Sequence, residues 1–284
     1  MSRQLEELNL IDNFLFSMMI DHEVYGAAAV QTILETTLQR EVKVGKILSE
    51  KVIAPERPGL HGIRMDAYIE EDAVDVSGGD VYDLEPDRRE KDKKDLSRRA
   101  RYYHSRTDGK LLKSMMKYRY LPKVWVIFIT SYGPFGSDRM VYTVRRHCKE
   151  LPELDYDDGD VTLYLYVEGK PDDDTPGELV QLLHFMGETN WENACNPSLK
   201  KLMEYVEELR RDPEVKEAYM HWDVYIQGER DDAREEGREE ERVNTRLEAA
   251  RADAAESRAS AAEEELARTK AALAALEKKY KQGS

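Results

Sequence analysis

The chain has 284 residues, of which 36% are charged and 40% are hydrophobic. This is enough for one sizeable globular domain, but too polar for a single compact body, so we expect an exposed appendage. A formal net charge of −15 excludes a protein that binds nucleic acid over its whole surface, but not one with a local basic segment. Two cysteines without metal-ligand spacing, and no apolar run of about 18 residues, predict a cytoplasmic protein without membrane contact.

The first half of the chain predicts helices, then strands, then a long helix and one buried strand. The expected ranges are a helical region at 5–39, strands at 43–54, 61–70 and 80–85, a helix at 94–118 and a strand at 124–129. The last of these is a continuous apolar run between Pro122 and Gly133, which is typical of a central, fully buried strand. This order predicts an α/β fold with a mixed central sheet flanked by helices.

The second half predicts two more strands, at 139–146 and 161–167, and then a helical region from Pro176 to about Ile226. That region has breaks near Asn196-Pro197 and Asp212-Pro213. From Glu229 the chain is rich in Ala, Glu and Arg, with a weak heptad spacing of apolar residues at Leu266, Leu273 and Tyr280. We therefore divide the chain into a core at 1–170, a helical extension at 171–228, and a charged C-terminal helix at 229–284. The last could form a coiled coil and a homo-oligomer.

Acidic side chains are concentrated on two of the predicted strands. Successive side chains alternate faces, so Asp83, Glu85 and Asp87 share one face of their strand. Arg64, Asp66 and Tyr68 share one face of the preceding strand. If the strands pair, their carboxylates converge, and converging carboxylates are what Mg²⁺ or Mn²⁺ needs. The alternative is that they are ordinary strand-end acids in solvent, with Asp83 exposed or behind the ligands.

A basic run follows directly. Residues 88–106 hold nine Lys or Arg and three Asp or Glu, a local balance of 9 − 3 = +6. Such a run is often a solvated face, but beside an acidic strand end it indicates contact with a DNA backbone. The candidate DNA-binding residues are Arg88, Lys94, Arg98, Arg101 and Tyr102.

Several segments, in the same order, carry a family likeness. The chain resembles the PD-(D/E)XK nuclease family transposases, also called recombination-promoting nucleases, over roughly residues 8–240. The segments that carry the resemblance are 12–16 (Asp-Asn-Phe-Leu-Phe), 62–66 (Gly-Ile-Arg-Met-Asp), 81–85 (Val-Tyr-Asp-Leu-Glu), 98–105 (Arg-Arg-Ala-Arg-Tyr-Tyr-His-Ser), 126–129 (Val-Ile-Phe-Ile) and 134–136 (Pro-Phe-Gly).

The resemblance implies a restriction-endonuclease-like core and Mg²⁺- or Mn²⁺-dependent cleavage of DNA, with a link to transposition or recombination. By position, Asp66 and Glu85 would be the metal-binding carboxylates. Arg98 and Tyr102 would lie on the helix that flanks the site, although Arg98 could instead form a buried ion pair with Glu85.

The chain departs from the family after the strand glutamate. The family has Glu-x-Gln there, or Glu-x-Lys in the wider superfamily, and this chain has Glu85-Pro86-Asp87. An aspartate supplies no positive charge, but Asp87 could be a catalytic third metal ligand. A basic residue such as Arg88, Lys91 or Arg98 could replace the lysine in space. The departure leaves two alternatives to an endonuclease: a catalytically degenerate fold that binds DNA or protein, and a scaffold whose working part is the C-terminal helix.

Overall fold

The structure is a computed structural model that describes residues 3–53, 63–72, 79–224 and 226–228, and isolated residues and short stretches between 238 and 273. The chain forms two compact units, Met1–Met220 and His221–Ser284. Among the helices described, none is both long and apolar enough to cross a membrane.

Six strands in the described residues form one mixed sheet, with the spatial order β1-β2-β3-β4-β6-β5. Their bounds are Val44–Ile53 (β1), Ile63–Glu71 (β2), Val81–Asp87 (β3), Val124–Thr130 (β4), Val141–Val144 (β5) and Asp160–Tyr166 (β6). Strands β1, β2 and β3 pair antiparallel, β3, β4 and β6 run parallel, and β5 pairs antiparallel with β6. The predicted α/β class with a mixed sheet is confirmed.

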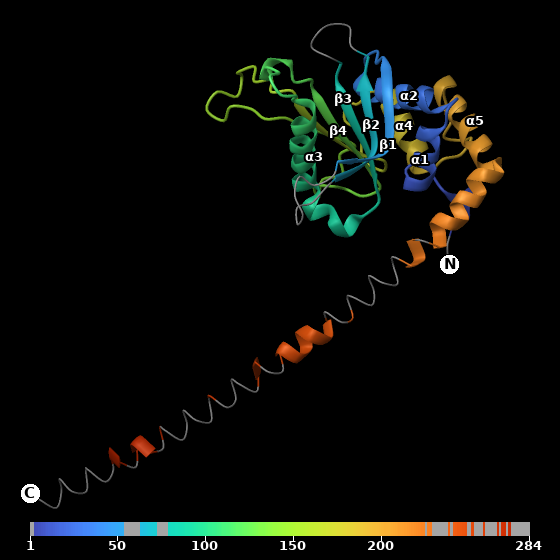
Figure 1. The fold of residues 1–284 in the computed structure, drawn as a ribbon. Coiled ribbons are helices and arrows are strands. Elements are labelled where there is room, and N and C mark those ends of the chain that lie inside the picture. Colours follow the sequence, from blue (N-terminus) through green and yellow to red (C-terminus); the bar gives the residue numbers. More distant parts are fainter. Residues whose placement is uncertain are drawn as a thin grey trace, which may run out of the picture. The chain divides into compact units, whose positions relative to one another are not determined.

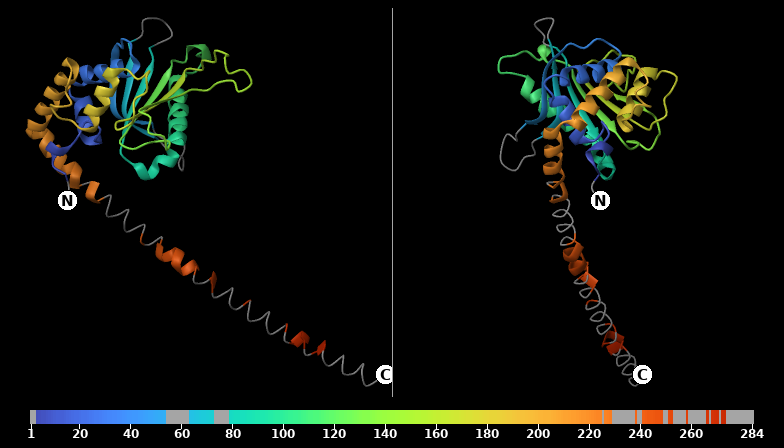
Figure 2. Two further views of the ribbon diagram at one scale, coloured as in Figure 1. Left: turned by 180° about the vertical axis from the view of Figure 1, so that it is seen from behind. Right: turned by 90° about the vertical axis from the view of Figure 1, so that its right-hand side faces the viewer.

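Helices cover both faces of the sheet. Their bounds are Asn13–Asp21 (α1), Gly26–Leu38 (α2), Leu96–Leu111 (α3), Gly177–Gly187 (α4) and Pro197–Arg211 (α5). Figures 1 and 2 show α3 on one face and the other four helices on the opposite side. Helix α3 connects β3 to β4, because two parallel neighbouring strands require a crossover.

The strand β4 was predicted to be central and buried, and it lies between β3 and β6 with most of its side chains inaccessible to water. On the α3 face, Val126 and Phe128 of β4 pack with Leu96, Ala100 and Tyr103 of α3 in one apolar cluster. That cluster fixes which side of α3 faces the sheet, and so decides which of its polar residues can reach the strands.

Two helical predictions were too long. The helix expected at 94–118 ends at Leu111, because Leu112 adopts an extended backbone and Met115 a positive φ of 69°. A 3₁₀ segment, η2 (Glu90–Asp95), leads into it. The helical region expected at 5–39 consists of α1 and α2, separated where His22 is extended.

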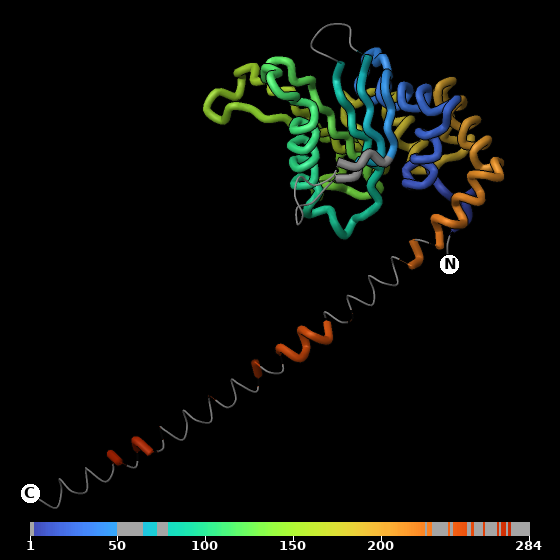
Figure 3. The backbone as a smooth tube through the Cα atoms, in the orientation of Figure 1, coloured from blue at the N-terminus to red at the C-terminus, as the bar shows by residue number. Residues whose placement is uncertain are grey.

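The helical extension predicted at 171–228 contains α4 and α5, and these two helices belong to the first unit. The predicted break at Asn196-Pro197 is the start of α5, where the Asn196 side chain accepts a hydrogen bond from the Leu199 N–H at 2.9 Å. Past α5, Tyr219 donates a hydrogen bond to the carbonyl of Arg3 at 2.7 Å, so the two ends of this unit lie side by side (Figure 3).

The second unit is described in part, and residues 241–248 are helical. The apolar side chains described there are about half exposed, among them Leu266 at 55% and Leu273 at 59%. Tyr280, the third member of the predicted heptad, lies outside the described residues. The coiled coil and the homo-oligomer therefore stay predictions.

Candidate functional site

The two acids predicted to bind metal lie on neighbouring strands. Strand β2 pairs with β3 through Ala67↔Leu84 and Tyr68↔Asp83, and Asp66 and Glu85 follow at the end of this pairing. The Asp66 N–H donates a hydrogen bond to Glu85 Oε1 at 2.9 Å. The sheet thus brings together two acids that are 19 residues apart in the sequence.

All the acidic side chains of β3 point toward α3. Glu85 pairs with Phe128, and Phe128 belongs to the cluster under α3, so the alternation places Asp83, Glu85 and Asp87 on that face. Their exposed fractions are 1%, 2% and 1%, respectively. Of the two alternatives for Asp83, exposure to solvent was wrong, and a buried position behind the candidate ligands is compatible with the structure. The side chain of Arg64, predicted on the same face as Asp66, lies outside the described residues.

The crowding of these acids shows in the electrostatics of Glu85. Burial raises the pKa of this carboxyl well above its ordinary value, and the negative charges of Asp83 and Asp66 raise it further. The Asp66 N–H and the positive charge of Arg99 act in the opposite direction. The site holds more negative than positive charge, which is the environment that attracts a cation.

Arg99 of α3 supplies positive charge inside the site. Its Nη2 lies 2.5 Å from Asp87 Oδ2 and 3.7 Å from Glu85 Oε2, and its side chain is 19% exposed. The guanidinium carbon lies 4.8 Å from the centroid of the Phe128 ring, so an aromatic face supports it.

Arg98 and Tyr102 lie on α3, the helix beside the acids, as predicted. Arg98 is 75% exposed and pairs with Asp95 at 3.5 Å, so the alternative of a buried ion pair with Glu85 was wrong. Tyr102 is 36% exposed, whereas Tyr103 is buried, and burial together with the charge of Glu85 raises the pKa of the Tyr103 hydroxyl. The signal was present in the sequence: Leu96, Arg99, Ala100 and Tyr103 follow the i, i+3, i+4, i+7 spacing of one helix face.

Both carboxylate oxygens of Asp87 contact nitrogen donors. Its Oδ1 accepts the Arg89 N–H at 2.7 Å, and its Oδ2 faces Arg99 and, at 3.5 Å, Arg89 Nη2. The strand predicted at 80–85 continues through Pro86 to Asp87 without a shift in its register with β4. Pro86 lies past the last β2–β3 pair, so its missing N–H interrupts no bond there.

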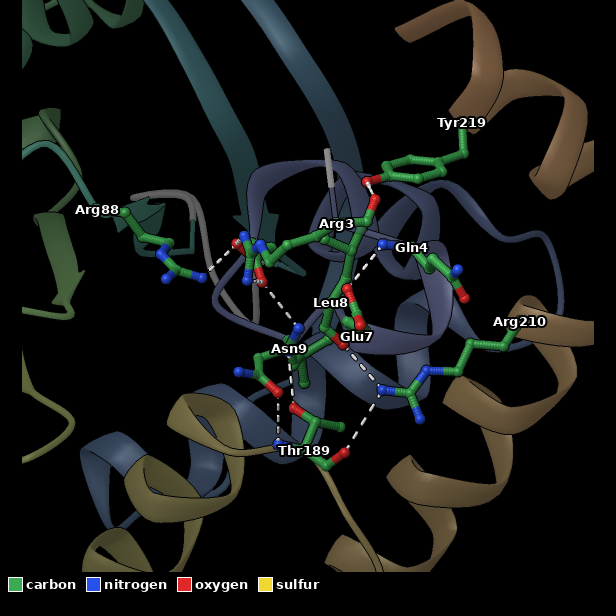
Figure 4. A network of polar contacts seen from close by, with 11 residues as sticks. Arg3, Gln4, Glu7, Leu8, Asn9, Arg88, Thr189, Arg210 and Tyr219 are labelled. Atoms are coloured by element: carbon green, nitrogen blue, oxygen red, sulfur yellow. Dashed lines mark hydrogen bonds and ion pairs between the residues drawn. The ribbon is translucent and has the colours of Figure 1, made fainter. Parts of the chain in front are cut away.

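The start of α1 reaches the edge of the site. Asn13 Nδ2 donates a hydrogen bond to Asp66 Oδ2 at 3.2 Å. The preceding residue, Asp12, is 6% exposed and accepts hydrogen bonds from the side chains of Arg3 and Arg88. Arg88, predicted to contact DNA, is thus tied to the N-terminal segment (Figure 4).

The same network continues away from the site. Arg210 of α5 donates a hydrogen bond to the Leu8 carbonyl at 2.8 Å, and the Leu10 N–H donates to Thr189 Oγ1 at 2.7 Å (Figure 4). Through these hydrogen bonds the segment before α1 contacts α5 at Arg210 and the residues that follow α4 at Thr189. Asp12 and Asn13 are held in place by packing remote from the strands.

The remaining predicted DNA contacts lie on the outer surface of η2 and α3. Lys94, Arg98, Arg101 and Tyr102 are all exposed. Arg88 is 40% exposed despite its ion pair with Asp12. We call the exposed side chains of Arg88, Lys94, Arg98, Arg101 and Tyr102 the η2–α3 basic surface.

The acidic side chains of the described residues offer oxygen ligands of the kind that Mg²⁺ prefers, but too few of them to enclose the ion. The Glu85 carboxylate lies next to the backbone of Asp66, a second acid, and Mg²⁺ is commonly held by one or two carboxylates with water and phosphate oxygens completing its shell. Within the described residues, no group of three or more His, Cys, Asp or Glu side chains is arranged to hold a metal ion. The residues therefore fit an open two-carboxylate site, not a closed protein cage.

Chemically, this arrangement joins a cation-attracting pair of acids to a buried guanidinium and a basic surface. Such a combination can bind a phosphate group and polarise it. Comparisons of the chain with protein-family models, with curated proteins and with solved structures found no match.

Proposed function

We propose that the protein is a Mg²⁺- or Mn²⁺-dependent DNA endonuclease of the PD-(D/E)XK type. The observation that carries the proposal is the 2.9 Å hydrogen bond from the Asp66 N–H of β2 to Glu85 Oε1 of β3, beside the buried side chains of Asp83 and Asp87. The element order supports it: a helical region, three antiparallel strands, a crossover helix and a parallel strand are what the resemblance implies for a restriction-endonuclease-like core.

In this proposal Asp66 and Glu85 hold the metal ion. When bound, the ion supplies an activated water molecule and stabilises charge on the scissile phosphate. Asn13 orients the Asp66 carboxylate, and the β2–β3 register orients Glu85. The η2–α3 basic surface binds the DNA backbone. The link to transposition or recombination rests on the sequence resemblance.

The test is nicking of supercoiled plasmid by the purified full-length chain with Mg²⁺, Mn²⁺ or EDTA. We expect metal-dependent nicking that is lost in Asp66→Ala and in Glu85→Ala. Asp173→Ala is the matched control, because Asp173 is an exposed acid outside both the acidic cluster and the η2–α3 basic surface. Circular dichroism would establish that each variant folds. Nicking by both Asp66→Ala and Glu85→Ala at the wild-type rate would contradict the proposal.

A second candidate is a catalytically degenerate nuclease fold that binds DNA or protein and assembles through its C-terminal helix. Two observations favour it: Glu85-Pro86-Asp87 lacks the lysine of the wider superfamily, and the described residues include no three-donor metal group. This candidate predicts a folded wild-type protein that binds DNA without nicking it in either metal, and that keeps its affinity in Glu85→Ala.

Assembly is tested separately by light scattering on the full chain and on a truncation before Glu229. If the C-terminal helix holds a homo-oligomer together, the full chain has a multiple of the monomer mass and the truncation is a monomer. Equal states for the two proteins would remove the assembly role, and with it the scaffold hypothesis in which the tail is the working part.

A further inference from the structure

The positively charged side chain of Arg99 contacts the buried acids of β3. Three carboxylates of β3, those of Asp83, Glu85 and Asp87, share the α3 face, and Arg99 contacts two of them. Asp66 of β2 donates its backbone N–H to Glu85. The chain has no lysine at the strand position after Glu85. A phosphodiester that approaches this cluster needs a positive charge to offset the repulsion of the acids.

We propose that Arg99 is the catalytic cation of this site, and that Asp87 is the anchor of Arg99 and not a metal ligand. This inference rests on the proposed nuclease function and adds to it. Asp87, which stands where the resemblance leads us to expect a lysine or glutamine, then has the role of holding Arg99. The positive charge of the site comes from α3 and not from the strand.

The contacts of Asp87 support the anchor role. One oxygen accepts the Arg89 N–H at 2.7 Å, and the other lies 2.5 Å from Arg99 Nη2. A carboxylate oxygen that receives such short charge-assisted bonds binds a metal ion only by giving them up. The side chain is also fully buried, at 0% exposure, behind Arg99 and Arg89.

The surroundings of Arg99 hold the guanidinium in one place. Phe128 lies beneath it, at 4.8 Å from the guanidinium carbon, and Tyr103 flanks it at 5.9 Å. Both acids are contacted through the same nitrogen, Nη2, and Nε finds no acceptor among the described residues. Nε and Nη2 are both buried, so of the five N–H donors of the guanidinium those of Nη1 remain for a phosphate oxygen.

Arg99 and a metal ion then act on the same carboxylates in opposite ways. Both neutralise Glu85, so each reduces the attraction that the acids exert on the other. Removing the guanidinium should make the carboxylates bind a divalent ion more tightly. It should also slow cleavage, since the charge that faces the phosphate is lost. An arginine with a purely structural role would lower metal affinity and cleavage together, through misfolding.

The experiment compares full-length wild type with Arg99→Met and Asp87→Asn. Calorimetric titration of the metal-free proteins with Mn²⁺ measures metal affinity without any reaction. Single-turnover nicking at saturating Mn²⁺ measures cleavage, and thermal melts check folding. For Arg99→Met we expect a Mn²⁺ affinity raised several-fold and nicking slowed by about 100-fold, the usual scale for losing one donor to a developing negative charge.

Asp87→Asn keeps the shape of the anchor and remains informative if Arg99→Met does not fold. We expect its Mn²⁺ affinity to stay within about twofold of wild type while nicking slows by about tenfold or more, since Arg99 loses its charged partner. Loss of Mn²⁺ binding in Asp87→Asn would make Asp87 a ligand and overturn the inference, as would wild-type nicking by Arg99→Met. A wild type that neither binds Mn²⁺ nor nicks would instead reject the nuclease function itself.

Discussion

The main chain of Asp66 holds the side chain of Glu85: the Asp66 N–H donates to Glu85 Oε1 across the β2–β3 pair at 2.9 Å. The position of one candidate ligand is therefore set by the backbone of the other. A shift of either strand by one residue would turn its side chains to the opposite face of the sheet and separate the two acids. The candidate site is as stable as this strand pairing.

Glu85→Gln should separate the charge of Glu85 from its role in packing. The amide oxygen can still accept the Asp66 N–H, and burial already disfavours the charged form of Glu85, so we expect the variant to fold and to melt no lower than wild type at neutral pH. Mn²⁺ affinity should fall by more than about tenfold, measured by calorimetric titration. Glu90→Gln, an exposed acid on η2, is the control and should bind like wild type. A Glu85→Gln protein with unchanged affinity would show that Glu85 is not a ligand.

The η2–α3 basic surface should set the salt dependence of DNA binding. Lys94→Ala and Arg101→Ala each remove an exposed positive charge, so we expect weaker binding and a salt slope reduced by about one per lost phosphate contact. Fluorescence anisotropy with a labelled duplex at several salt concentrations measures both quantities. Lys200→Ala, on the exposed side of α5, is the control. If all three variants behave alike, DNA does not bind on η2 and α3.

Asp108, at the end of α3, should make stability depend on pH. Burial and then the negative charge of Asp160 raise the pKa of the Asp108 carboxyl from 3.8 to about 6, although His104 and Arg146 partly oppose this. An acid whose pKa is raised by folding stabilises the folded state at pH values below its unfolded pKa. For Asp108 this contribution is lost as the pH rises through about 6.

Asp108→Asn should therefore stabilise the protein at pH 7, by about 1–2 kcal/mol after allowance for partial solvent screening, with a gain that disappears near pH 4. Urea unfolding at several pH values measures it, with Asp173→Asn, an exposed acid, as the control. If Asp108→Asn stabilised the protein equally at pH 4 and pH 7, the pKa of Asp108 would not be raised in the folded state.

Asp12 should contribute to stability through its three donors. It accepts hydrogen bonds from Arg3, from Arg88 and from the Asn9 N–H at 2.8 Å. Asp12→Ala leaves these groups without their acceptor, so we expect a loss of about 1–3 kcal/mol in the free energy of unfolding. Asp21→Ala, an exposed acid in the last turn of α1, should change it by less than about 0.5 kcal/mol.

A double-mutant cycle with Arg88→Ala would measure how much of the Asp12 contribution comes from that pair. We expect a positive coupling energy, because the two side chains are in direct contact. Additive effects of the two substitutions would mean that the ion pair contributes nothing and that the Asn9 N–H and Arg3 account for the whole loss.

The sequence by itself was sufficient wherever a local period decides the geometry. The alternation of a strand placed Asp83, Glu85 and Asp87 on one face, and the structure has them there. The apolar run of β4 identified the central strand, since continuous burial on both faces leaves a continuous apolar sequence. The class of the fold followed from the order of such elements.

Tertiary structure decided the rest, because it depends on contacts between distant residues. Arg99, and not Arg98, reaches the acids since the cluster under α3 sets the rotation of that helix. The bond between Asp12 and Arg88 joins residues 76 apart in sequence, and no local pattern marks it. The burial of Asp83 likewise follows from the packing of α3 over β3: a strand's own sequence shows which side chains share a face, but which face is covered depends on the elements that pack against it.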